Sequence, residues 1–144
     1  MATYGTFTDG SMLKASELND FFTTTTVTPV VRQTANLGNS AANTWGRYFR
    51  VNDLVIYMGK IAPQVNGTNL QRLELDLPVT AKTDNTRVIG NAYIFSTFHD
   101  FVVPVLYSTT RVAFIQRFGT ITQYYDTALL TTHLLTFQLF YEAA

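Results

Sequence analysis

The residues of this sequence with the clearest potential for chemistry are two histidines and a scatter of carboxylates. His99 directly precedes Asp100, and His133 lies far from both. A zinc site needs three or four converging ligands, and neither histidine has a second histidine or a spaced pair of carboxylates near it. The aspartates also lack the every-second-residue spacing of a calcium loop. We therefore expect no metal and no cofactor, with both histidines at a loop or at the start of a strand.

Two carboxylates, Glu74 and Asp76, lie on one face of an expected strand, at a separation that a glycosidase could use. Any alternating strand with two acids meets this condition, and Arg72 beside them favours a salt-bridged surface. The sequence also lacks a Gly-Lys-Ser loop, a nucleophile elbow and a His-Glu-x-x-His motif. We therefore predict that the protein is not an enzyme, with polysaccharide cleavage as a minor alternative.

Aromatic residues could bind sugar rings by stacking. Tyr124, Tyr125, Tyr93, Tyr107 and Trp45 are the candidates for such a platform. Because aromatic residues make up 14% of the sequence and occur throughout it, positions in the core or at a subunit interface are the favoured interpretation. Binding of a glycan stays open as an alternative.

The composition indicates one domain with a surface that carries little charge. The chain has 144 residues, of which 47% are hydrophobic and 14% are charged, against a usual charged share of about a quarter. The net charge is +0, so we expect no nucleic-acid partner. The sequence contains no cysteine, no pattern of a secretory signal and no apolar run that could cross a bilayer. We expect a protein made in a cytoplasm, without membrane insertion, that assembles against other subunits.

The elements that position these residues fall into two parts, of which residues 1–44 form the first. We interpret this part as an N-terminal attachment arm and the segment that leads into the next domain. It contains one predicted helix, in the stretch ASELNDFF of residues 15–22, with Leu18, Phe21 and Phe22 on one face. A helix this short is marginal in water, so it must dock on something.

Residues 45–144 form the second part, a domain in which apolar residues alternate with a period of two. Asn52 and Asp53 tolerate positive φ angles and should join the strands Tyr48–Val51 and Leu54–Ile61 as a tight hairpin. Further strands are predicted at residues 70–77, 87–95, 101–108, 110–118 and 134–142. Short strands with recurring turns indicate an all-β protein, an antiparallel β-sandwich of jelly-roll type.

The predicted strand 110–118 is apolar on both faces. Phe114 and Phe118 lie on one face, and Ala113 and Ile115 lie on the other. A sheet that is apolar on both faces needs a second cover, which a neighbouring copy could supply. We therefore predict an oligomer with these four residues at its interface. The alternative is that the N-terminal arm folds back over this face.

Several stretches of the sequence resemble segments of tailed-bacteriophage virion proteins. They are WGRYFRVNDLVIY at 45–57, LDLPVTA at 75–81, TFTDG and LKASELN at 6–10 and 13–19, and LTFQLFYE at 135–142. The pattern in those proteins is Gly-x-Tyr-x-x-x-Gly-x-x-Val followed by Leu-Pro-aromatic-x-Ala, then a similar closing strand. This sequence has Asn52-Asp53 where Gly is more usual and Val79 where the aromatic residue usually follows Leu-Pro.

This resemblance implies a β-sandwich that trimerises on a tail fibre, head fibre or capsid surface. The sequence has no shaft repeats and no coiled-coil heptads. We therefore predict a homotrimeric capsid decoration, or cement, protein at the virion surface, whose partner is the major capsid protein or another virion subunit. The contacts predicted for the arm are Phe7, Leu13, Leu18, Phe21 and Phe22. The alternative is a tail-fibre or tail-tip receptor-binding protein that recognises a host surface glycan.

Overall fold

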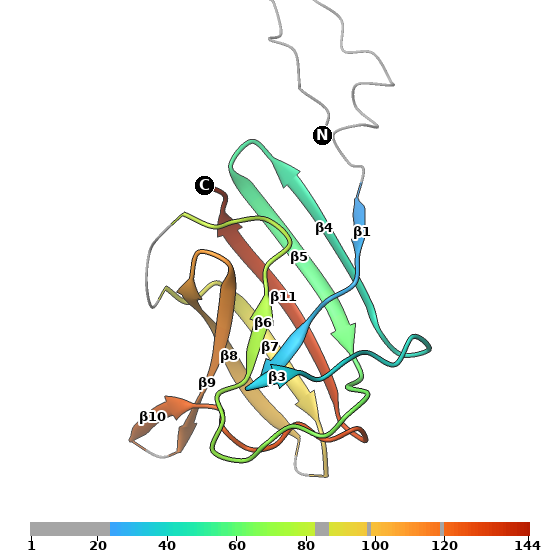
Figure 1. Ribbon diagram of the computed structural model, residues 1–144. Coiled ribbons are helices and arrows are strands. Elements are labelled where there is room, and N and C mark those ends of the chain that lie inside the picture. The colour runs from blue at the N-terminus through green and yellow to red at the C-terminus, as the bar shows by residue number, and fades with distance from the viewer. Residues whose placement is uncertain (1–23, 83–86, 98, 119) are drawn as a thin grey trace, which may run out of the picture.

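The computed structural model describes residues 24–82, 87–97, 99–118 and 120–144, and this part of the chain is all β-structure without a helix (Figure 1). The predicted helix at 15–22 lies outside the described residues. The strands are β1 (Thr25–Val27), β2 (Val31–Gln33), β3 (Ala35–Asn36), β4 (Trp45–Val51), β5 (Leu54–Ile61), β6 (Glu74–Asp76), β7 (Gly90–Phe95), β8 (Asp100–Ser108), β9 (Arg111–Phe118), β10 (Ile121–Tyr124) and β11 (Leu134–Glu142).

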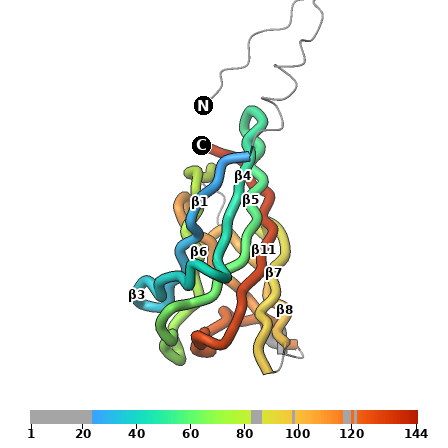
Figure 2. Tube along the Cα trace, turned by 90° about the vertical axis from the view of Figure 1, so that its right-hand side faces the viewer, coloured from blue at the N-terminus to red at the C-terminus, as the bar shows by residue number. Residues whose placement is uncertain are grey.

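These strands form one curled antiparallel sheet, a half-barrel, in the order β1-β4-β5-β11-β7-β8-β9-β6-β2-β3, with β10 paired to β9. Strand β8 turns the corner of the curl. Its first residues, Asp100 to Val102, pair with β7, and those from Val103 onward pair with β9. Strands β4, β5, β11 and β7 lie next to one another in one layer (Figure 2). The all-β antiparallel class is therefore confirmed.

The hairpin of β4 and β5 is confirmed in detail. Val51 pairs with Leu54, which leaves Asn52 and Asp53 as the two residues of the turn. Asn52 has a φ of 53°, the left-handed conformation that an asparagine tolerates better than most residues. The two strands stay in register over their whole length, as far as Trp45 opposite Lys60.

The hydrophobic core fills the inside of the curl. Strand β11 shows how the sequence directs it there, since Leu135, Phe137, Leu139 and Tyr141 are buried and the residues between them face outward. This alternation matches the prediction. The core continues through β5, β7, β9 and β6, so a single apolar cluster holds both ends of the sheet together.

Strand β6 is shorter than the predicted strand at 70–77. The backbone N–H of Leu70 donates to the carbonyl of Asp126, and that of Leu73 donates to the carbonyl of Tyr125. These residues are therefore tied to the loop before β11, and the ladder with β9 begins only at β6. Leu73 is nevertheless buried, as its place in the predicted alternation requires.

Strand β7 also begins later than predicted, at Gly90 instead of residue 87. Gly90 has a φ of +154°, and a Cβ there would lie 2.0 Å from the carbonyl oxygen of Gln138 on β11. Only a glycine permits this close approach of two strands.

The sheet also includes residues that the sequence assigned to the segment leading into the domain. Strand β1 pairs with β4, β2 pairs with β6, and Val31 in β2 is fully buried. The sheet therefore begins at Thr25, well before Trp45. These strands have only two or three residues each, which is too few to show a period of two. Strand β1 also lies in a threonine-rich stretch, which by its composition indicates a linker.

Candidate interaction surfaces

The outward face of β4, β5, β11, β7 and β8 carries many apolar side chains with polar ones between them, and we call it the outer apolar face. The register places one residue of each strand at the same level. This row runs Trp45, Lys60, Thr136, Tyr93, Phe101. The apolar members of the face are Trp45, Phe49, Leu54, Ile56, Met58, Tyr93, Phe95, Phe101 and Phe140.

Several of these side chains are unusually exposed. Phe101 is 79% exposed and Trp45 is 46% exposed, and four further members are exposed by more than a third. Taking roughly 200 Å² for a fully exposed large side chain, these six leave about 600 Å² accessible. The largest contiguous apolar patch of a soluble monomer is usually about 300–600 Å². The total on this face is comparable, although polar residues divide it, and a face of this kind suits an interaction.

The most exposed part of this face is an aromatic cluster around Tyr93. The ring centroid of Tyr93 lies 4.6 Å from that of Phe95 and 4.9 Å from that of Phe101, both in edge-to-face geometry. His99 stacks against Tyr93 at 6.1 Å. His99 is therefore part of an aromatic surface, and Asp100 beside it begins β8.

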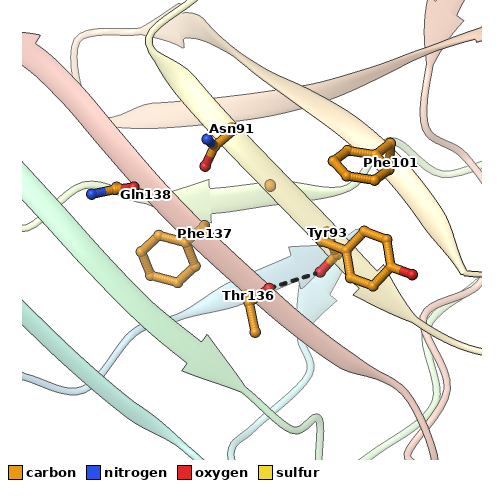
Figure 3. A pocket seen from close by; sticks show the side chains of 7 residues that line it. Asn91, Tyr93, Phe101, Thr136, Phe137 and Gln138 are labelled. Carbon is orange, nitrogen blue, oxygen red and sulfur yellow. Dashed lines mark hydrogen bonds between the residues drawn. The ribbon is translucent and has the colours of Figure 1, made fainter.

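A hollow of about 310 Å³ adjoins this cluster on the surface between β7 and β11 (Figure 3). Phe101 and Tyr93 lie on one side of the hollow and Gln138 lies on the other (Figure 3). The hydroxyl of Thr136 donates to the carbonyl of Tyr93 at 3.4 Å. The lining is completed by Asn91, which is the cross-strand neighbour of Gln138. No charged residue lines the hollow, so its chemistry suits a neutral group.

The carboxylates Glu74 and Asp76 form ion pairs on the opposite half of the sheet. Arg32 donates from Nη2 to Asp76 at 2.8 Å and from Nε at 3.0 Å, and this hydrogen bonding raises the pKa of Arg32 above its ordinary value. Glu74 is only 8% exposed and accepts from Arg72 at 2.6 Å and from Arg111 at 3.1 Å. Both carboxylates are thus engaged by arginines, as the salt-bridge interpretation predicted.

Two of the candidate tyrosines hold one of these arginines. The guanidinium of Arg72 lies 3.7 Å from the ring centroid of Tyr107 and 5.1 Å from that of Tyr124. Burial alone would lower the pKa of Arg72, but the hydrogen bond and charge of Glu74 outweigh it, and the pKa is raised. Tyr107 and Tyr124 therefore act in a cation–π contact.

Tyr125 and His133 occupy structural positions. Tyr125 is buried in the core, and burial, followed by the charge and hydrogen bond of Asp100, raises its pKa to about 12. It cannot present a face to a sugar. The Nδ1 of His133 accepts from the backbone N–H of Leu130 in the turn before β11. Burial lowers the pKa of His133 below its ordinary value.

The predicted interface residues of β9 are mostly enclosed by the chain itself. Phe114 belongs to the core, and Ala113 is fully buried on the other face, next to Glu74 and its ion pairs with two arginines. Neither is accessible to a neighbouring copy. Ile115 is half-buried, and the side chain of Phe118 is outside the described part of the structure. The predicted arm contacts Phe7, Leu13, Leu18, Phe21 and Phe22 also lie outside it.

Sequence reasoning missed the outer apolar face, although its signal is present in β5. Leu54, Ile56 and Met58 point outward from this strand, while its alternate residues are buried.

Within the described ranges, no group of three or more histidines and carboxylates could hold a metal ion. The same residues include no helix long and apolar enough to span a membrane. No protein-family model, no curated protein and no solved structure matches this chain.

Proposed function

We propose that this chain is a non-enzymatic structural protein of a bacteriophage virion, a homotrimeric capsid decoration protein that bridges neighbouring capsid subunits. In this proposal the curled sheet is a β-sandwich of jelly-roll type at the virion surface, and the N-terminal arm attaches it to the major capsid protein or to another virion subunit. The observation that carries the proposal is the outer apolar face, which leaves about 600 Å² of apolar side chain exposed on a single chain.

The chemistry of the described residues supports a structural role. The two carboxylates on β6, Glu74 and Asp76, are occupied by ion pairs with three arginines. The net charge of +0 provides no strong long-range attraction, so association depends on apolar contact. The resemblance of the hairpin and the closing strand to virion proteins provides the assignment to a phage particle.

A second candidate function is a tail-fibre or tail-tip adhesin that binds a host glycan. The hollow beside Phe101 favours it, because the amide side chains of Asn91 and Gln138 are exposed next to an exposed aromatic ring. Amides bind sugar hydroxyls, and aromatic rings pack against the apolar faces of sugars.

Copy number on purified particles distinguishes the two functions. A decoration protein is present in hundreds of copies, in a fixed ratio to the major capsid protein, whereas an adhesin is present in a few tens at most. Quantitative mass spectrometry of purified virions, with labelled peptides of both proteins as standards, measures this ratio. A ratio typical of a tail protein would reject the decoration role, and absence from the particle would reject both functions.

A further inference from the structure

We infer that the outer apolar face is the subunit interface of the homotrimer, and that copies meet on it head to tail, with β4 and β5 of one copy against β7 and β8 of the next. The inference rests on the homotrimer of the proposed function and identifies where its subunits meet. This face differs from the one predicted on β9.

The area of the face fits a second copy of the chain. A stable interface buries about 800 Å² on each partner, with an apolar centre and a polar rim. The exposed apolar side chains supply about 600 Å² of this. Exposed polar residues of the same strands, such as Asn91 and Gln138, lie between and around them and supply the remainder.

The shape of the face also suits a copy of itself. Phe101 is the most exposed aromatic side chain within the described ranges, and the 310 Å³ hollow lies directly beside it (Figure 3). Phe101 and the hollow both lie on the β7 side of the face, so in a head-to-tail contact this side can receive a side chain from β4 or β5 of the next copy.

The two halves of the face differ in chemistry, and this difference favours contact between unlike halves, which in the trimer of the proposed function is head-to-tail. The β4 and β5 half carries Arg47, Lys60 and Met58, and neither cation has an ion-pair partner within the described chain. The β7 and β8 half carries the aromatic cluster of Tyr93, Phe95, His99 and Phe101. Cations and methionine sulfur both bind favourably to aromatic rings.

A two-fold arrangement that matched like half with like half would bring the cations of two copies together. A head-to-tail contact places them against aromatic rings instead, and such contacts close into a ring when the rotation permits. Three copies would then surround an axis near β11, the strand between the two halves.

The test changes the charge at position 101 of the full-length protein. Size-exclusion chromatography with light scattering over a dilution series then measures the oligomeric state of each variant. Phe101→Lys puts a third cation against Arg47 and Lys60 of the neighbouring copy, whereas Phe101→Glu puts a carboxylate there. Leu70→Lys is the matched control, because Leu70 is 82% exposed and lies in a loop away from this face. Phe101 is mostly exposed, so its variants should fold, which circular dichroism and melting temperature verify.

We expect a trimeric wild type and a trimeric Leu70→Lys variant. Phe101→Lys should weaken association by about 30-fold or more, the loss expected at the centre of an interface. Phe101→Glu should be clearly less affected, and adding Arg47→Glu to Phe101→Lys should restore part of the loss.

Three results would overturn the inference. A Phe101→Lys variant as trimeric as the wild type would place the interface elsewhere and leave the proposed function standing. Equal losses for the Lys and Glu variants would reject the contact with the cations. A monomeric wild type would remove both the interface and the homotrimer, and if a neutral hexose then changed its tryptophan and tyrosine fluorescence, the face would be assigned to a glycan.

Discussion

The side chain of Gln33 should contribute more to stability than any other polar side chain in the described core. It is only 2% exposed. Its Nε2 donates to the carbonyls of Gln71 and Thr127 at 2.9 Å each, and its Oε1 accepts from the N–H of Leu129 at 2.8 Å. Gly67 makes room for this amide, because a Cβ there would lie 1.8 Å from Oε1. One side chain thus fastens β2 to the loop before β6 and to the loop before β11.

Replacing Gln33 by Ala removes the partner of three backbone groups, the buried N–H of Leu129 and the part-buried carbonyls of Gln71 and Thr127. Each such group costs about 1–3 kcal/mol, and partial access of water reduces the sum, so we expect a loss of about 3–5 kcal/mol in the free energy of unfolding. For a domain of this size that loss lowers the melting temperature by about 10–20 °C. Differential scanning calorimetry and urea unfolding measure both quantities. Gln123→Ala, at an exposed position in β10, is the control and should change little.

The variant Gln33→Glu tests the same contacts through pH. Its carboxylate would face two carbonyl oxygens, so the pKa of the new side chain in the folded state should lie above the unfolded value of about 4.3. The native state then binds more protons than the unfolded state between these two pKa values. The loss of stability should be smallest below the unfolded pKa, grow as the pH rises through the folded pKa, and stay constant above it. A loss under 1 kcal/mol for the Ala variant, or a loss for Glu that does not depend on pH, would refute the reasoning.

Three further predictions concern the backbone, the core and the arm. Gly90→Ala should lower the free energy of unfolding by about 3 kcal/mol or more, because the new Cβ would clash with the carbonyl of Gln138. A thermal unfolding curve with an unchanged melting temperature would contradict the close approach of β7 and β11 at Gly90. Tyr125 should ionise near pH 12 in a difference-absorbance titration against Tyr125→Phe. Because its pKa is raised from 10.0, the stability that Tyr125 contributes should be complete below the unfolded pKa and be lost between pH 10 and 12. Ionisation at the ordinary value would show that Tyr125 is not buried. Particles that carry the double variant Phe21→Ala, Phe22→Ala should lose the protein on washing at both low and high salt, while the wild type should stay bound. The attachment would instead be polar if high salt released the wild type and the double variant bound as tightly as the wild type at low salt.

The long strands of this fold could be predicted from the sequence because their alternation is complete. Strand β11 buries every second residue from Leu135 to Tyr141, and the hairpin of β4 and β5 has a turn of two residues that both tolerate positive φ. Local patterns of this kind are determined by the residues themselves. The short strands β1 to β3 could not be predicted, because two or three residues show no alternation and because β1 and β2 pair with the later strands β4 and β6.

The sequence predicts that β9, which is apolar on both faces, is covered by a neighbouring copy. The exposed apolar side chains lie instead on the outward face of β4, β5, β11, β7 and β8. In β9 the chain itself covers both sides, through the core at Phe114 and beside the ion pairs of Glu74 at Ala113. The sequence shows the charges but not that they gather next to Ala113. Strand β8 was predicted, but its pairing was not, and it is this pairing that sets the exposed Phe101 beside Tyr93 on β7.

A density map of the virion tests the proposed function most directly. We expect three-fold density on the capsid surface, between neighbouring capsid subunits. Three copies of the curled sheet should fit into it with their outer apolar faces around the axis and their N-termini directed at the capsid. Density for this fold confined to the tail, or a capsid surface without it, would contradict the account.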